Sequence, residues 1–186
     1  MRPRGNAGRA SKLVALLGAL CLFLSSIEYM IPKPFPFMRI GIANLPLMLA
    51  LDMLGRGDFF LLVLIKILGQ ALVTGTLFSY VFLFSLAGTT LSASAMFFLR
   101  RLCGRRIGFI GIGVAGAMLS NLSQLFLASF FVFGKSVAYI APPFLGAGLV
   151  AGVCLGAFCE HFASTSAWYA AVKRGGAGGS APRISE

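Results

Sequence analysis

The chain has 186 residues, of which 58% are hydrophobic and only 11% carry a charge, a balance that excludes an ordinary soluble domain with water on all sides. Its net charge of +11 would suit nucleic-acid binding. However, most of the 16 basic residues lie in short segments beside hydrophobic runs, which is how membrane topology is encoded, and no nucleic acid is expected as a partner.

Six hydrophobic stretches follow one another along the chain. They cover about residues 13–31, 40–54, 59–75, 77–99, 107–133 and 137–158. This pattern predicts an all-α fold, an integral membrane bundle of six transmembrane helices over residues 13–160. A basic segment, residues 1–12, precedes the bundle, and a cytoplasmic tail over residues 161–186, which becomes rich in Gly and Ser, is predicted to be largely disordered.

The connections between the stretches carry their own signals. Three prolines at alternate positions between Ile31 and Arg39 forbid a helix, so an ordered extended loop is predicted there. The segment from Gly55 to Asp58 predicts a tight turn that leads into the third helix. The fourth stretch ends at the arginine cluster of residues 100–106, and its hydroxyl groups are expected to satisfy one another or a bent backbone.

The distribution of basic residues predicts the topology. If six spans begin with the N terminus inside, 12 basic residues fall in cytoplasmic segments, and only Lys33, Arg39 and Lys135 fall in outer loops. Such an asymmetry is typical of membrane proteins, whose cytoplasmic loops carry an excess of Lys and Arg. We therefore expect a multi-pass protein of the cell membrane with both termini in the cytoplasm.

Small residues recur along three of the stretches, often four residues apart. Such spacing lets helix backbones approach closely where lipid supplies no hydrophobic driving force, so packing within the bundle is the simplest interpretation. These residues are Ala15 and Ala19 in the first stretch, Gly111, Ala115 and Gly116 in the fifth, and Gly146, Gly148, Gly152 and Gly156 in the sixth.

Polar and ionisable groups at membrane depth are costly, so each is a candidate for function or for internal pairing. Lys66 lies near the middle of the third stretch and needs an oxygen-bearing partner there. The alternative is that Glu28 forms a structural ion pair with Arg39 or Lys66, and that the amides only tie helices together. The candidates for a substrate-binding cavity open to the outside are Glu28, Arg39, Asn44, Lys66, Gln70, Asn121 and Gln124.

The sequence offers no catalytic signature. The patterns HExxH, GxSxG and the P-loop are absent, and Asp52 and Asp58 are the only aspartates. Prenyl transfer with magnesium would need clustered acidic residues to hold the metal. We therefore expect no catalysis, no cofactor and no metal site in this chain, and any ATP-driven activity must come from another chain.

Several segments together resemble the Gx transporter family, which is also named heptaprenyl diphosphate synthase component I. The likeness covers roughly residues 13–160, and this chain differs from the family pattern at Lys66, where Arg is expected, and at Ser120, where His is usual. The segments that carry it are Leu16 to Ala19, Ile27-Glu28, Ile31-Pro32, the Gly-Ile-Ala-Asn run ending at Asn44, Lys66 with Leu68-Gly69, Gly75 to Ser79, Ser85 to Gly88, and Ser120 to Gln124.

The family looks like the substrate-binding S components of energy-coupling factor (ECF) transporters. The resemblance implies a six-helix protein that captures a vitamin or similar small molecule from outside, under the loop between its first two helices. It also implies docking on a transmembrane coupling protein that carries two cytoplasmic ATPases. An alanine pair on the first helix is the usual docking surface, and Ala15 and Ala19 match it.

Two main functions follow as hypotheses. In the first, the chain is the substrate-binding subunit of an ATP-driven importer: Arg39 and Lys66 neutralise an acidic or phosphorylated ligand, the amides hydrogen-bond it, and Glu28 pairs with a cation or contacts an amine. In the second, which the synthase name suggests, the chain is a non-catalytic membrane subunit that assists a prenyl diphosphate synthase. A stand-alone proton-coupled carrier is a weaker third hypothesis, because it needs a titratable relay deeper than Glu28.

Overall fold

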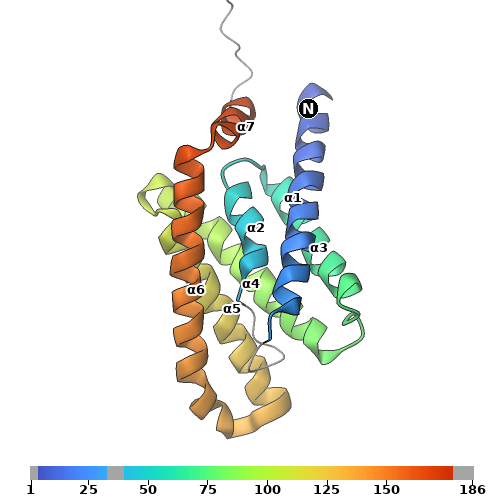
Figure 1. The fold of residues 1–186 in the computed structure, drawn as a ribbon, viewed down its shortest axis with the longest axis vertical. Helices are drawn as coiled ribbons and strands as arrows, with labels where there is room; N and C mark the ends of the chain where they lie inside the picture. Colours follow the sequence, from blue (N-terminus) through green and yellow to red (C-terminus); the bar gives the residue numbers. More distant parts are fainter. Residues whose placement is uncertain (1–3, 33–39, 178–186) are drawn as a thin grey trace, which may run out of the picture.

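The computed structural model describes residues 4–32 and 40–177, and within these ranges the chain forms helices and no strands. Figure 1 shows them as a bundle whose long helices run roughly side by side. The helices are α1 (Arg4–Met30), α2 (Leu45–Ala50), α3 (Arg56–Val73), α4 (Tyr80–Cys103), α5 (Phe109–Ala128), α6 (Val137–Thr165) and α7 (Ala167–Ala177).

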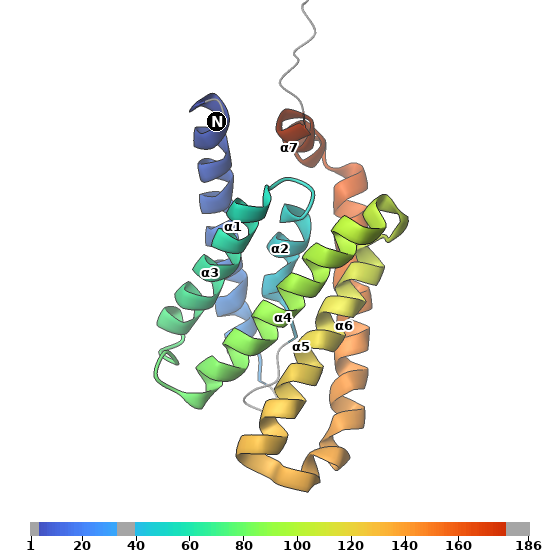
Figure 2. The ribbon, with the colours of Figure 1, turned by 180° about the vertical axis from the view of Figure 1, so that it is seen from behind.

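Two groups of helices build the bundle. Helix α5 packs against α4 on one side and α6 on the other, while α1 packs against α3. The short helix α2 lies between these groups and contacts α1, α3, α5 and α6, as Figures 1 and 2 show from opposite sides. All its residues from Pro46 to Ala50 are buried, so α2 faces protein on every side.

Three stretches are long and apolar enough to cross a membrane, judged by length and composition within the described residues. They are Gly8–Met30, Tyr80–Cys103 and Phe109–Thr165, and the last of these contains both α5 and α6. These stretches are compatible with a membrane protein, but six separate spans are not evident.

The prediction that residues 40–54 cross the membrane is wrong. Helix α2 has six residues and rises only about 9 Å, whereas the hydrocarbon core is about 30 Å thick. Gly41 has a left-handed backbone with φ 88°, which prevents a helix from starting earlier than the 3-10 turn Ile42–Asn44. The run is apolar because it is buried in protein.

The predicted third span corresponds to α3, which the same criteria do not identify as a membrane span. This helix has 18 residues and carries Arg56, Asp58 and Lys66. Asp58 lies in its first turn, as the sequence predicts, where a carboxylate interacts favourably with the helix dipole.

The C-terminal region also differs from the prediction. A largely disordered tail was expected from residue 161, but α6 continues to Thr165 and α7 follows it. The hydroxyl of Ser166 accepts a hydrogen bond from the backbone N–H of Tyr169, which starts α7. The side chain of Tyr169 is buried in the hydrophobic cluster that contains Met48 and Cys159, so an aromatic anchor holds this helix on the bundle.

Helices α5 and α6 touch backbone to backbone, as the small residues predict for this pair. A Cβ atom added at Gly156 would lie 2.5 Å from the Cα of Ile110, and one at Gly113 would lie 2.6 Å from the carbonyl oxygen of Gly152. By contrast, a Cβ at Gly146 would meet nothing within 4 Å. Close packing thus depends on particular glycines of α6, and Gly146 is not one of them.

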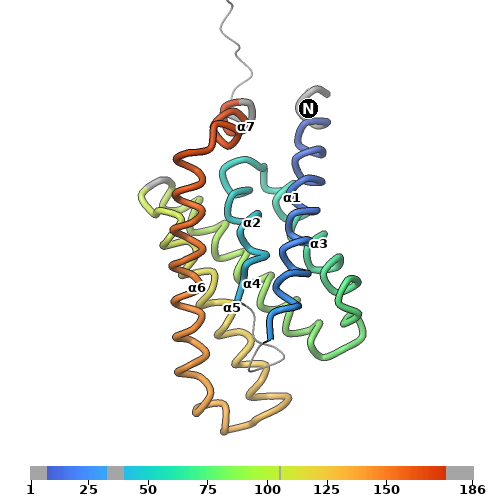
Figure 3. Tube along the Cα trace, in the orientation of Figure 1, coloured from blue at the N-terminus to red at the C-terminus, as the bar shows by residue number. Residues whose placement is uncertain are grey.

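The connections between the helices are divided between the two ends of the bundle. The start of α1, the turn between α2 and α3, the connection between α4 and α5, and α7 gather at one end, whereas the α5–α6 turn lies at the other (Figures 1 and 3). The first end therefore collects the described segments that carry the basic residues predicted to be cytoplasmic. Near the opposite end, α5 passes through a π-helical turn at Ser129–Phe133, and α6 contains Pro142 and Pro143 close to its start.

Candidate functional site

A small cavity lies inside the bundle, enclosed by residues of α1 to α6. About 30 Å³ is open to the centres of water molecules, which is room for about two of them. Its wall contains both polar and apolar residues. Its polar groups come from helices that are far apart in the sequence.

Glu28 from the end of α1 forms one part of the polar wall. Its Oε1 accepts a hydrogen bond of 3.1 Å from the backbone N–H of Gly41, and its Oε2 accepts one of 3.4 Å from that of Ala43. The left-handed conformation of Gly41 forms this turn, and an L side chain there would be strained. The buried carboxylate thus ties the end of α1 to the approach to α2.

Lys66 from the middle of α3 forms the next part, with only 3% of its side chain exposed. Its Nζ donates a hydrogen bond to Oδ1 of Asn44, the residue directly before α2. Gln70 lies one turn further along α3 and also lines the cavity. An ammonium group and a carboxylate therefore share the wall of one buried cavity.

The amides of α5 complete the set predicted from the sequence. Asn121 lines the cavity, and its Nδ2 donates a hydrogen bond of 3.1 Å to the carbonyl of Phe144 on α6. Gln124 is fully buried, and its Nε2 donates to the hydroxyl of Ser120, which lines the cavity. The Oε1 of Gln124 is buried without a hydrogen-bond partner among the described residues.

Two hydroxyl residues of α4, Thr89 and Ser92, also line the cavity, although they were expected only to satisfy one another or a bent backbone. Ser92 is 1% exposed, and its Oγ has no hydrogen-bond partner in the described part of the chain. The signal that identifies them is their spacing with Met96, since residues at i, i+3 and i+7 share one face of a helix.

The rest of the wall is apolar. Glycines of α5 and α6 bring their backbones to the cavity, and Met48, Met96 and Leu155 add side chains without hydrogen-bonding groups. A Cβ at Gly116 would lie 2.9 Å from the Cγ and Sδ of Met96 and 3.0 Å from the Oγ of Ser92, so the glycine is needed for these side chains to fit. A molecule held here would meet both hydrogen-bonding groups and hydrocarbon.

The structure brings most of the predicted site residues together. Gln124 adjoins the cavity through Ser120, and Arg39 lies outside the described residues. The alternative role of the amides as ties between helices also applies, because Asn121 bonds α5 to α6. The predicted residues on the cavity wall are Glu28, Asn44, Lys66, Gln70 and Asn121.

The two alanines predicted to face a partner lie on a different surface. Ala15 and Ala19 are both exposed on α1. Ala15 lines a shallow depression between α1 and α3, together with Asp58 and Ile65. These small residues therefore do not serve packing inside the described bundle.

Comparison with known families bears on the identity of the chain. A family model described as heptaprenyl diphosphate synthase component I matches residues 17–162. The chain belongs to this family. The match runs from α1 to near the end of α6, so it includes every described residue of the cavity wall. No curated protein and no solved structure matches the chain.

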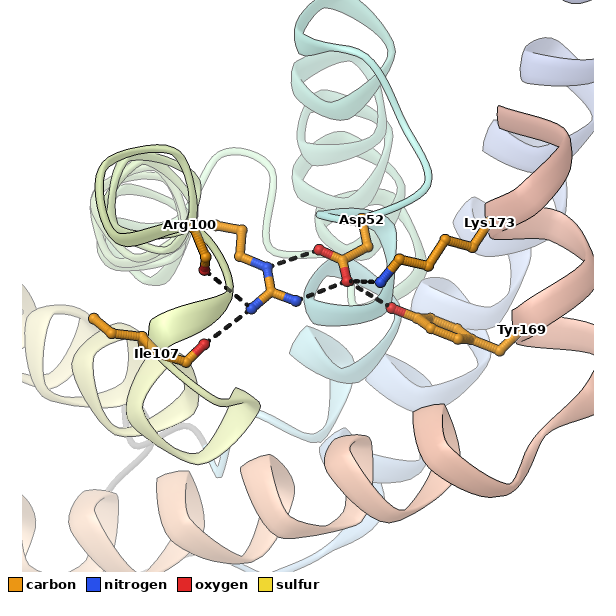
Figure 4. A network of polar contacts seen from close by, with 6 residues as sticks. Asp52, Arg100, Ile107, Tyr169 and Lys173 are labelled. Atoms are coloured by element: carbon orange, nitrogen blue, oxygen red, sulfur yellow. Dashed lines mark hydrogen bonds and ion pairs between the residues drawn. The ribbon is translucent and has the colours of Figure 1, made fainter. Parts of the chain in front are cut away.

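A second polar cluster lies at the end of the bundle where α7 packs (Figure 4). Asp52, in the turn after α2, accepts hydrogen bonds from Arg100 of α4 and from Tyr169 and Lys173 of α7. The guanidinium of Arg100 also donates a 2.9 Å hydrogen bond to the carbonyl of Ile107. One carboxylate thus joins three parts of the fold.

The charges around Asp52 determine how it ionises. Burial alone would raise the pKa of its carboxyl, but the hydrogen bonds and positive charges of Arg100 and Lys173 outweigh burial and hold the pKa well below its usual range. Burial and the neighbouring carboxylate both raise the pKa of the Tyr169 hydroxyl. The cluster is therefore an ionised aspartate with neutral and cationic donors around it.

Proposed function

We propose that this chain is the substrate-binding membrane subunit of an ECF-type ATP-driven importer for a vitamin-like or other small metabolite. The observation that carries the proposal is the buried cavity, where Glu28, Lys66 and neutral hydrogen-bonding side chains converge inside an apolar bundle. Burying such groups costs free energy, so in a membrane protein they are functional candidates by default. The cavity holds only about two water molecules, so capture of a metabolite requires its walls to open.

The importer hypothesis assigns energy supply to other chains. A transmembrane coupling protein with two cytoplasmic ATPases would provide it, since this sequence has no P-loop. Ala15 and Ala19 are exposed on α1 and are proposed to face that partner. Both termini are proposed to be cytoplasmic, which is supported by the basic residues collected at the end where α1 begins and α7 packs.

The family description favours a second candidate. A heptaprenyl diphosphate synthase component I could be a non-catalytic membrane subunit that assists a separate prenyl diphosphate synthase. Neither candidate places catalysis in this chain. The second candidate predicts co-purification with a soluble synthase and assigns no purpose to the buried polar cavity.

Ligand binding and uptake test the importer proposal. The purified protein is heated with and without a panel of vitamins, and uptake is measured in cells that also express a coupling protein and its ATPases. We expect at least one vitamin to raise the Tm, and Lys66→Gln to lose that shift and the uptake. Lys135→Gln is the matched control, since Lys135 is exposed in the α5–α6 connection. No Tm shift with any vitamin, together with recovery of a soluble synthase in a pull-down, would favour the second candidate.

A further inference from the structure

Helix α7 has two different faces. On one face, Tyr169 is buried and Lys173 donates to the carboxylate at the centre of the second polar cluster, so this face holds the helix on the bundle. Trp168, Ala171 and Arg174 are exposed, and their spacing places them on the other side of the helix. Trp168 is 41% exposed and is the only tryptophan in the sequence. The packing of α7 therefore leaves a tryptophan and an arginine pointing outward.

The length of α6 indicates how deep α7 would lie in a bilayer. Helix α6 has 29 residues and is about 43 Å long, whereas the hydrocarbon core is about 30 Å thick. At its α7 end it carries Glu160 with an exposed side chain, and a carboxylate in hydrocarbon is costly, so the hydrocarbon would end at or before this residue. Helix α7 begins at Ala167, within about 10 Å of Glu160, and turns away from the line of α6 (Figure 1). Its side chains would therefore reach the lipid headgroups.

Two further exposed arginines lie at the same end of the bundle. Arg101 belongs to the last turn of α4, and Arg106 belongs to the 3-10 turn that follows. The neighbouring Arg100 bonds to Asp52, the carboxylate that α7 also contacts (Figure 4). The same ion pair thus holds the end of α4 near α7.

This end of the bundle carries an excess of positive charge. The basic residues with described side chains there are Arg9, Lys12, Arg56, Arg100, Arg101, Arg106, Lys173 and Arg174, and the acidic ones are Asp52, Asp58 and Glu160. The flanking residues whose side chains are not described are Arg2, Arg4, Arg105, Arg183 and Glu186, so by sequence they add more positive than negative charge. The sign of the charge therefore does not depend on the undescribed side chains.

The chemistry of these side chains matches that of an anionic phospholipid. A guanidinium group binds the oxygens of a phosphate at two points, and basic clusters beside membrane-spanning helices attract anionic lipids. Tryptophan is enriched at the headgroup level, where its ring contacts the acyl boundary and its N–H meets polar groups. Lys173 and Arg100 are already bonded to Asp52, so the contact falls to the other arginines.

We propose that Trp168 and Arg174 on the outward face of α7, together with Arg101 and Arg106, bind the headgroups of anionic phospholipids in the leaflet at this end of the bundle. The proposal is independent of the choice between importer subunit and synthase subunit, because both place the chain in a membrane. Bound lipid would hold α7 on the bundle from the side opposite to Asp52.

The single tryptophan makes the depth of α7 measurable in the unmodified protein. The full chain is placed in nanodiscs whose phosphatidylcholine carries either a nitroxide on the headgroup or bromine atoms midway along the acyl chains. We expect the headgroup nitroxide to remove most of the Trp168 emission and the bromine atoms to remove little of it. Iodide in the water should quench Trp168 less in nanodiscs than in the detergent-solubilised protein.

A matched pair of variants tests the charge. Arg174→Gln and Lys135→Gln each remove one exposed positive charge, from α7 and from the α5–α6 connection at the opposite end. Each protein is released from nanodiscs that contain equal amounts of phosphatidylglycerol and phosphatidylcholine, and native mass spectrometry gives the ratio of the two lipids bound. We expect phosphatidylglycerol to exceed phosphatidylcholine on the wild type, and Arg174→Gln to lower the ratio about three- to fivefold. Lys135→Gln should keep the ratio of the wild type.

Each result supports or overturns the proposal. Quenching of Trp168 by the headgroup nitroxide, with a lowered lipid ratio for Arg174→Gln alone, supports it. Strong quenching by the bromine atoms would place α7 in the hydrocarbon and overturn it. Full quenching by iodide without quenching by the nitroxide would also overturn it and would leave the outward face of α7 to a protein partner. Equal lipid ratios for Arg174→Gln and Lys135→Gln would show that the arginines of this end do not select the lipid.

Discussion

The guanidinium of Arg100 meets the carboxylate of Asp52 at two points, with Nε 2.7 Å from Oδ1 and Nη2 2.7 Å from Oδ2. Such a two-point pair fixes the orientation of both groups and is stronger than a single hydrogen bond. It joins the turn after α2 to the last turn of α4, and Lys173 brings α7 to the same carboxylate at 2.5 Å. Three segments distant in the sequence therefore depend on one acidic residue.

Asp52→Asn should destabilise the protein by about 2 kcal/mol, because it leaves the partly buried guanidinium of Arg100 without its charged partner. Thermal unfolding in detergent measures the effect. Glu160→Gln is the control, since the Glu160 side chain is exposed on α6 and substitutions at exposed positions usually change stability by less than about 0.5 kcal/mol. Equal losses from the two variants would contradict the role given to Asp52.

The same carboxylate predicts how stability depends on pH. Its pKa in the folded protein lies below the value of about 3.9 in an unfolded chain, so its contribution is complete above about pH 5. The contribution shrinks as the pH falls below about 4, because the unfolded chain then takes up a proton at this carboxyl while the folded protein does not. The Tm difference between the wild type and Asp52→Asn should therefore be constant from pH 7 to 5 and shrink by pH 3. If the Tm difference did not change with pH, the effect of Asp52→Asn would come from packing and not from the charge of the carboxylate.

Tyr169→Phe tests how α7 is attached. The hydroxyl donates a 3.1 Å hydrogen bond to Oδ2 of Asp52, and losing it should cost about 1 kcal/mol. Because the ring stays buried, the loss should appear as faster hydrogen exchange confined to α7. Tyr139→Phe should leave exchange unchanged, since the Tyr139 side chain is 87% exposed. Unchanged exchange in α7 of Tyr169→Phe would show that the ring alone anchors the helix.

Two glycines of α6 form a matched pair for substitution. Gly156→Ala would place a methyl group 2.5 Å from the Cα of Ile110, and overpacking of this kind costs about 1–3 kcal/mol. Gly146→Ala meets no neighbour and should be neutral or gain up to about 1 kcal/mol of helix propensity. Unfolding of both variants in the same detergent measures the contrast, and a stable Gly156→Ala would contradict the close contact of α5 with α6.

The sequence predicted the long helices well, because α1, α4, α5 and α6 are apolar over lengths that suit a membrane. It failed at α2, since hydropathy cannot distinguish a segment buried in protein from one buried in lipid. Pro46 to Ala50 are buried against neighbouring helices, and no local pattern reports that. It also failed at α7, because the contact that holds Tyr169 is with Asp52, 117 residues earlier in the chain.

The candidate site was predictable where its residues are unusual for an apolar helix. Glu28 and Lys66 stand out because a charge at membrane depth is costly, and they line one cavity. Ser92 does not stand out, because a hydroxyl in a helix can bond to the preceding turn of the backbone. Its oxygen has no hydrogen-bond partner in the described chain because of how α4 packs against α5. The sequence does not reveal that packing.

The paired prolines near the start of α6 indicate how deeply this end of the bundle would lie in a lipid bilayer. Proline has no N–H group, so Pro142 and Pro143 leave the carbonyls of Ala138 and Tyr139 without their usual helical donors. Hydrocarbon offers no replacement, whereas water among the headgroups does. Tyrosine is also enriched at that level, and Tyr139 projects from this turn. In a bilayer, the lipid headgroups would therefore meet the bundle at this turn of α6.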